Sequence, residues 1–173
     1  FVLATNNSAS RVSQHVEKLA RMGVQVQERE ILTSALATAS YLGSEAAAGT
    51  RVYTIGGEGI HHALREQGFT ISESHVDYVV VGIDREISWE KLDIATQNIR
   101  AGAMFVGTNP DVTFPSERGI SIGNGAILAA LQAATGVQPL IIGKPHPMMY
   151  KQAMARMQGT PDNTLAIGDR LET

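Results

Sequence analysis

The sequence predicts an α/β fold built on a mainly parallel sheet. Short β-type apolar runs alternate along the chain with longer stretches in which apolar residues recur every three or four positions. This alternation is typical of βαβ units. The run Tyr78-Val79-Val80-Val81 is continuously apolar, as expected of a strand covered on both faces. No internal repeat or low-complexity segment interrupts the pattern.

The composition is that of an ordinary globular protein and excludes several classes of function. The 173 residues are 43 % hydrophobic and 18 % charged, and 14 Lys and Arg against 17 Asp and Glu give a net charge of −3. Because there is no basic stripe, we expect no nucleic-acid partner. The absence of cysteine excludes disulfides and thiolate metal sites, and fits the cytoplasm that we expect as the location. No apolar run approaches the roughly 18 residues of a membrane span, so we expect no membrane partner.

The expected elements follow one another in the order of the pattern. Strands are expected at residues 1–4, 52–55, 78–81, 104–106, 140–142 and 164–167. Helices are expected at about 10–22, 34–43, 60–67, 88–101, 127–135 and 147–157. The polar, proline-containing segment 107–119 is expected to be a loop, and "GGEG" at 56–59 a tight turn.

Local signals mark where these helices begin and end. Thr33 and Ser88 precede apolar periodic stretches and are expected to be N-caps. Pro147 suits the first turn of a helix. Glycines stand where four of the helices should stop, at Gly23, Gly68, Gly102 and Gly136.

Polar loops follow several of the predicted strands. Ligands of parallel α/β folds bind at the carboxyl ends of the strands. That rule selects the loops "TNNS", "TNPD", "GKPHP" and "GDRLET".

Three of these loops carry side chains suited to a phosphoryl group. Thr5 supplies a hydroxyl, and the backbone N–H of Asn6 lies at the expected start of a helix, where anions bind. Lys144 supplies a compact positive charge, and Asp169 a carboxylate of the kind that Mg²⁺ prefers. A hydroxyl, backbone amides, a lysine and a metal carboxylate together stabilise the charge that develops in phosphoryl transfer.

The same segments resemble a known family. "ATNNS", "GKPHP" and "IGDRLET" resemble the second, third and fourth signature motifs of the haloacid dehalogenase superfamily of phosphohydrolases. The long insertion, with "DYVVVGID" and "TNPD", is similar to the NagD-like (p-nitrophenyl phosphatase-like) branch. The resemblance covers essentially the whole chain. It implies a Rossmann-like parallel-sheet core at residues 1–47 and 139–173, with an inserted α/β cap domain at 48–138.

The resemblance also implies the roles of single residues. Thr5 would hydrogen-bond the transferring phosphoryl group, with Asn6 beside it, and Lys144 would neutralise the phosphate and the nucleophile. Asp169 would ligate Mg²⁺. Substrate contacts are expected from four further residues: Asn7, Asn109, Asp111 and Phe114. For the loop that holds the last three, the alternative is a simple turn anchored by its aromatic ring.

The implied activity is Mg²⁺-dependent hydrolysis of small phosphomonoesters through an aspartyl-phosphate. Candidate substrates are sugar phosphates, nucleoside monophosphates, phosphoglycolate and glycerol phosphate. The family's nucleophile belongs to an Asp-x-Asp-Gly motif, which does not occur in the sequence, and an aspartate that usually follows "GDRLET" is also missing. We therefore expect a fragment whose nucleophile lies upstream. A homodimer through the cap is expected as well.

Two alternatives to this activity stay open. One is a non-catalytic phosphometabolite-binding protein on the same fold, which the residues upstream would distinguish. The other is a nucleotide-binding α/β domain of a different family. That domain would need a glycine-rich phosphate loop after the first strand, and none is present there.

Overall fold

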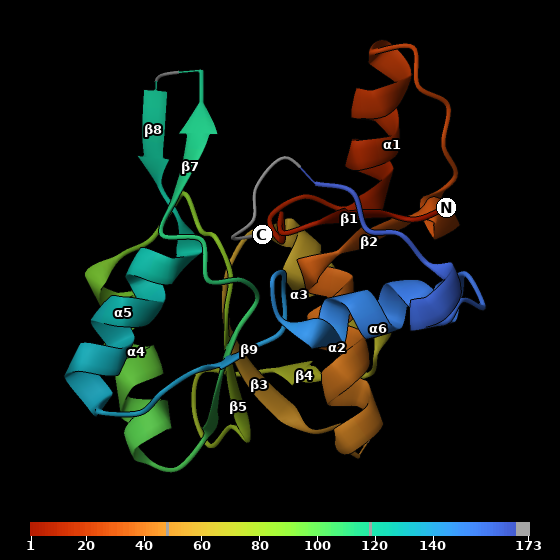
Figure 1. Cartoon of the computed structure of the whole chain (residues 1–173). Coiled ribbons are helices and arrows are strands. Elements are labelled where there is room, and N and C mark those ends of the chain that lie inside the picture. The colour runs from red at the N-terminus through yellow and green to blue at the C-terminus, as the bar shows by residue number, and fades with distance from the viewer. Residues whose placement is uncertain (48, 118, 169–173) are drawn as a thin grey trace.

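The computed structural model describes residues 1–47, 49–117 and 119–168. Its largest sheet has the strand order β4-β3-β5-β6-β9, and every neighbouring pair in it is parallel (Figure 1). The predicted α/β class with a mainly parallel sheet is therefore confirmed. The strands of this sheet are β3 (Arg51–Ile55), β4 (Thr70–Ile71), β5 (Tyr78–Val81), β6 (Met104–Gly107) and β9 (Leu140–Ile141).

Helices cover both faces of this sheet, which explains its continuously apolar strands. Successive strand residues point to opposite faces. Val52 and Val80 thus pack in one buried cluster with α2, α3 and α6, whereas Tyr53 and Val79 pack in another with α4 and α5. Figure 1 shows the two groups of helices on opposite sides of the strands. The helices are α2 (Ser34–Glu45), α3 (Glu58–Glu66), α4 (Trp89–Arg100), α5 (Asn124–Thr135) and α6 (Pro147–Arg156).

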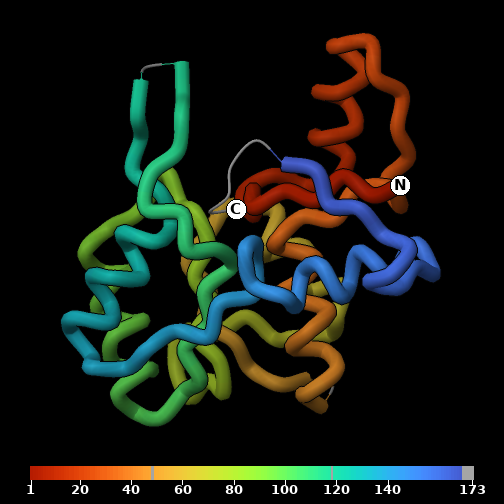
Figure 2. Tube along the Cα trace, in the orientation of Figure 1, coloured from red at the N-terminus to blue at the C-terminus, as the bar shows by residue number. Residues whose placement is uncertain are grey.

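A second sheet contains the first strand of the chain. β1 (Leu3–Thr5) pairs in parallel with β2 (Ile31–Thr33), and α1 (Val12–Arg21) connects them. Figure 2 shows α1 standing out beside the main body, and none of its residues is fully buried. The sequence does not predict β2, because three residues after the 3-10 turn Glu28–Glu30 are too few to show a periodicity.

The segment 107–119 is more ordered than the expected loop. β7 (Thr113–Ser116) forms an antiparallel hairpin with β8 (Gly119–Ile122), and the hairpin projects from the body in Figure 1. Pro115 lies opposite Ile120 in this ribbon. Proline is tolerated at a sheet edge. The sequence does not predict the hairpin, because the residues of one strand do not show which strand it pairs with.

The predicted helix ends are confirmed where the chain carries a capping signal. The hydroxyls of Thr33 and Ser88 accept hydrogen bonds from Leu36 N (3.1 Å) and Lys91 N (3.2 Å). Glycines with positive φ follow helices at Gly23, Gly68, Gly102 and Gly136, and Pro147 opens α6. None of the helices in the described part of the chain has the length and apolarity to cross a bilayer.

The strand expected at residues 164–167 is wrong. After the 3-10 helix Pro161–Asn163 these residues have no regular structure, and Leu165 and Ile167 are 82 % and 89 % exposed. An apolar run becomes a strand only where a neighbouring strand pairs with its N–H and C=O groups. No strand of the described ranges pairs with this segment.

The division into a core at 1–47 and 139–173 and a cap at 48–138 stays a prediction. Two packing relationships cross these boundaries. β9 pairs with β6 of the expected cap, and α2 shares a buried cluster with β3. The main sheet therefore continues as far as residue 141 and ends three residues before Lys144.

Candidate active site

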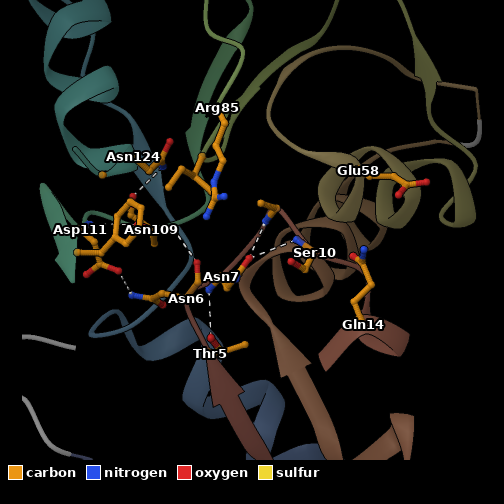
Figure 3. A pocket seen from close by; sticks show the side chains of 14 residues that line it. Thr5, Asn6, Asn7, Ser10, Gln14, Glu58, Arg85, Asn109, Asp111 and Asn124 are labelled. Atoms are coloured by element: carbon orange, nitrogen blue, oxygen red, sulfur yellow. Dashed lines mark hydrogen bonds between the residues drawn. The ribbon is translucent and has the colours of Figure 1, made fainter. Parts of the chain in front are cut away.

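A cavity of about 500 Å³ lies where the carboxyl ends of strands from both sheets meet (Figure 3). Its walls come from the segments that follow β1, β3, β5 and β6, together with β7 and the start of α5. This is the position that the strand-end rule predicts, although the strands belong to two sheets and not to one. Six of the residues selected from the sequence line it: Thr5, Asn6, Asn7, Asn109, Asp111 and Phe114.

The loop after β1 is held by its own side chains. Thr5 Oγ1 accepts from Asn7 N at 3.2 Å, and Asn7 Oδ1 accepts from Ala9 N at 2.9 Å and Ser10 N at 3.2 Å. Short polar side chains fold locally in this way because they can replace a backbone partner. The loop is thereby fixed, and the Thr5 O–H remains a donor toward the cavity.

The side chain of Asn6 joins three segments that are distant in sequence. Its Oδ1 accepts from Lys144 N at 2.8 Å, and its Nδ2 donates to Lys144 O at 2.9 Å. The same Nδ2 donates to Asp111 Oδ2 at 3.0 Å. All the hydrogen-bonding groups of this amide are therefore engaged with protein, so Asn6 positions its neighbours instead of offering its side chain to a ligand.

Two buried asparagines hold the loop after β6 in place. Asn109 Nδ2 donates to Asn6 O at 2.8 Å, and its Oδ1 accepts from Asp111 N at 3.1 Å. Asn124 Nδ2, at the first position of α5, donates to Asn109 O at 2.9 Å and to Val81 O at 3.1 Å. Asn109 thus acts through the loop geometry that it maintains, and the Asp111 carboxylate is held at the cavity wall.

Glycines allow the two sheets to approach closely on either side of the cavity. Gly59 N donates to Ala9 O at 2.8 Å, and a Cβ on Gly59 would clash with the carbonyl oxygens of Ser8 and Ser10. A Cβ on Gly143 would clash with the carbonyl of Thr108 and lie 2.8 Å from Asn6 Oδ1. Gly59 and the glycine before Lys144 are therefore contact points between segments. The tight turn expected at residues 56–59 is wrong for its second half, because α3 already begins at Glu58.

Lys144 lies beside the cavity, although its side chain is not part of the wall. Its backbone is fixed by Asn6, and its ammonium has no carboxylate partner among the described residues. Asp169, the predicted metal ligand, lies outside the described residues. The structure therefore brings together the Thr5 loop, the loop after β6 and the Lys144 loop. It does not test the fourth loop selected from the sequence, "GDRLET".

Eight further residues that were not selected from the sequence as site residues line the cavity, and Glu58, Arg85 and Asn124 are among them. Glu58 begins α3, Arg85 follows β5 and Asn124 begins α5. The strand-end rule, applied to β3 and β5, would have selected Glu58 and Arg85. Asn124 follows a glycine in "GNGA" and shows only the signal of a helix start.

The donor chemistry of the cavity wall fits a hard cation. Hydroxyl, amide and carboxylate oxygens line it, and no His or Cys is found among the described lining residues. Such donors suit Mg²⁺ or Ca²⁺ better than Zn²⁺. No group of three or more His, Cys, Asp or Glu side chains that could hold a metal ion occurs in the described ranges, the cavity included. Mg²⁺ does not need such a cluster, because it keeps several waters and binds one or two carboxylates and the substrate phosphate.

Two family models match the chain. A haloacid dehalogenase-like hydrolase model covers residues 1–70, and a HAD-hydrolase-like model covers residues 141–173. An acid sugar phosphatase of Staphylococcus aureus is 45 % identical over 170 residues, which are 98 % of this chain. The chain spans 65 % of the length of that relative.

Solved structures with the same architecture are also similar in sequence. A thermostable NPPase (p-nitrophenylphosphatase) of Geobacillus stearothermophilus superposes with a TM-score of 0.95 at 36 % identity, over 99 % of this chain and 69 % of that one. A glycerol phosphate phosphatase of Mycobacterium tuberculosis, solved in complex with magnesium, gives 0.87 at 34 % identity. That match covers 91 % of this chain and 49 % of the other.

Proposed function

Because this chain belongs to the haloacid dehalogenase-like hydrolase family, in its p-nitrophenyl phosphatase-like (NagD-like) branch, we propose that the full-length protein hydrolyses small phosphomonoesters. The observation that carries this proposal is the pair of hydrogen bonds by which Asn6 fixes the Lys144 loop beside the Thr5 loop. A hydroxyl donor in the cavity wall and a lysine beside the cavity, 139 positions apart in sequence, are in this way held in neighbouring loops. Sites of this kind stabilise the negative charge of a transferring phosphoryl group.

In the proposed reaction, a carboxylate oxygen attacks phosphorus and the bond from phosphorus to the leaving oxygen breaks. A general acid protonates the leaving alcohol, and water then cleaves the aspartyl-phosphate to release inorganic phosphate. Thr5 donates its O–H to a phosphoryl oxygen, since its Oγ1 already accepts from Asn7 N. Lys144 balances the charge of the phosphate and the nucleophile. The reaction requires an aspartate outside residues 1–173, because these contain no Asp-x-Asp-Gly motif.

Mg²⁺ is proposed as the metal. It would supply a Lewis acid that neutralises charge on the phosphoryl oxygens, and Asp169 would hold it. Support comes from the oxygen-rich wall of the cavity and from the magnesium complex of the related glycerol phosphate phosphatase. The name of the Staphylococcus aureus relative favours sugar phosphates among the candidate substrates. Phe114 and the loop at Asp111 would contact the organic part, and Asn7 would lie between it and the phosphate.

The test is hydrolysis of p-nitrophenyl phosphate by the full-length protein, with Mg²⁺ and then with EDTA. We expect turnover that EDTA abolishes and added Mg²⁺ restores. An Asp169→Asn variant should need at least about tenfold more Mg²⁺ for half-maximal rate, since it replaces a charged ligand by a neutral one. Full activity in EDTA would contradict the metal, and an unchanged Mg²⁺ requirement in the variant would remove Asp169 from the site.

The second candidate is a non-catalytic phosphometabolite-binding protein. It is favoured by one observation, the absence of the nucleophile motif from these 173 residues. Calorimetry on the full-length protein distinguishes the two. Saturable binding of sugar phosphates without release of phosphate would support the binding protein, and phosphate release would exclude it.

A further inference from the structure

The cavity contains an arginine that the proposed chemistry does not use. Arg85 lies in the loop between β5 and α4, and its side chain points into the cavity toward the Asn7 loop (Figure 3). The residue is exposed, and the structure gives it neither a salt bridge nor a hydrogen bond within the described ranges.

Three carboxylates at or beside the cavity are engaged with groups other than Arg85. Its neighbour Asp84 forms a 2.7 Å ion pair with Lys91, and the Asp84 side chain is only 8 % exposed. Glu58, at the start of α3, pairs with Arg11 at 2.5 Å. Asp111 accepts from Asn6 at 3.0 Å.

This pairing leaves a guanidinium facing the cavity without a compensating anion from the described chain. Arginine carries five N–H donors in a planar fork that matches a carboxylate or phosphate with two parallel hydrogen bonds. The phosphoryl group itself is assigned to Thr5, in the cavity wall after β1, and to Lys144, which lies beside the cavity in the loop after β9. Arg85 enters from a different strand, β5. Its natural ligand is therefore a second anionic group on the same substrate.

We propose that Arg85 is a specificity-determining residue that binds an acidic substituent, a carboxylate or second phosphate, on the leaving group of the substrate. Among the sugar phosphates favoured above and the other candidates, the preferred substrates are then those with such a group, namely phosphomonoesters of sugar acids or hydroxy acids and bisphosphates, and not phosphorylated neutral polyols. This inference rests on the proposed phosphatase function. A cavity of about 500 Å³ has room for a phosphoryl group and a sugar-sized acid together.

The experiment compares matched pairs of substrates with the full-length protein. Each pair differs only in a carboxylate replacing a hydroxymethyl group: 6-phosphogluconate against sorbitol 6-phosphate, and 3-phosphoglycerate against glycerol 3-phosphate. The wild-type kcat/KM should favour the acid of at least one pair by about tenfold or more. Arg85→Gln should lower kcat/KM for that acid by about 10- to 100-fold, the usual range for a charge-assisted hydrogen-bonded pair. The value for its neutral partner should stay within about threefold.

Two further variants separate recognition from general charge. Arg85→Lys keeps the charge but loses the fork, so the preference should fall only partly. Arg100→Gln removes another exposed arginine, at the end of α4 and outside the cavity, and should leave the preference unchanged. Equal loss for the acid and the neutral member in Arg85→Gln, or no wild-type preference in either pair, would overturn the proposal.

Failure of this inference can be distinguished from failure of the phosphatase function. p-Nitrophenyl phosphate carries no second anionic group, so its hydrolysis reports the function alone and should be unaffected by Arg85→Gln. If the protein turns over no phosphomonoester, the proposed function fails, while calorimetric binding of the same pairs still tests Arg85. Tighter binding of the acids that disappears in Arg85→Gln would support the assignment, and equal binding would contradict it.

Discussion

The side-chain amide of Asn6 forms two hydrogen bonds with the backbone of Lys144, as the backbone of a neighbouring strand would. Asn6 Oδ1 accepts from Lys144 N at 2.8 Å, and Asn6 Nδ2 donates to Lys144 O at 2.9 Å. The two residues are 138 positions apart. The backbone of the lysine loop is thus held independently of its side chain, and the ammonium has no carboxylate partner in the part of the chain that the structure describes.

Removal of the Asn6 amide should loosen this junction. We expect Asn6→Ala to lower the free energy of unfolding by about 1–3 kcal/mol, because Lys144 N, Lys144 O and Asp111 each lose a partner in a half-buried site. Urea unfolding measures the loss. Gln97→Ala, on the exposed face of α4, should change stability by less than about 0.5 kcal/mol. Equal urea midpoints for the two variants would show that the hydrogen bonds of Asn6 contribute nothing to the stability of the protein.

Two helical glycines should respond to alanine with opposite signs. Gly59→Ala should destabilise, since its Cβ would lie 2.7 Å from Ser8 O and close to Ser10 O, both in the backbone of the adjacent loop. Gly43→Ala should stabilise by up to about 1 kcal/mol, because alanine is the better helix former and the nearest atom, at 2.6 Å, is the movable end of the Gln67 side chain. Thermal unfolding of both variants measures the difference. A Gly59→Ala protein as stable as the wild type would contradict the close approach of the first turn of α3 to the Ser8–Ser10 loop.

The ammonium of Lys144 should matter for rate and little for stability. Lys144→Ala should reduce kcat for p-nitrophenyl phosphate by about 10²–10³-fold, the usual cost of losing one preorganised charge contact. The melting temperature should shift by no more than about 2 °C, because the Asn6 bonds are made to the Lys144 backbone. Lys151→Ala, on the exposed face of α6, is the matched control. A variant with wild-type turnover would exclude Lys144 from the site.

Two half-buried histidines should make stability fall on acidification. Burial is the largest cause that lowers the pKa of His15 and of His61, and the nearby cations Lys18 and Arg65 act in the same direction. Above the unfolded pKa of about 6.5 both rings are neutral in the folded and the unfolded state, so protonation of the histidines costs no stability there. As the pH falls below 6.5 toward the folded pKa values, the unfolded chain binds more protons and stability is lost.

The corresponding measurement is urea unfolding between pH 7.5 and 5. The free energy of unfolding should decline across this range, and the decline should be smaller in His61→Gln, which cannot be protonated. His62→Gln, in the neighbouring position on α3, serves as the control. A steeper decline in His61→Gln than in the wild type would contradict the role of His61.

Much of the fold could be predicted because its signals are local. The strands β3, β5 and β6 are apolar runs, α2 and α4 begin at the capping hydroxyls of Thr33 and Ser88, and glycines with positive φ end helices. Each of these features depends on residues within one turn or one strand, so each can be identified from the sequence alone. The same holds for the Thr5–Asn7 loop, whose hydrogen bonds span two or three residues.

The α/β class, the helix ends and the residue types that a phosphoryl site requires follow from the order of the amino acids. Three features follow from the folded chain alone: β2 and the β7–β8 hairpin form pairs, residues 164–167 form none with the described strands, and the Asn6 amide binds Lys144 and Asp111. The folded chain also places Arg85 in the cavity and leaves it without a carboxylate partner in the described chain. The reason is that strand pairing and charge compensation depend on which distant segments come into contact in the folded protein. The number of residues between two segments does not determine whether they come into contact.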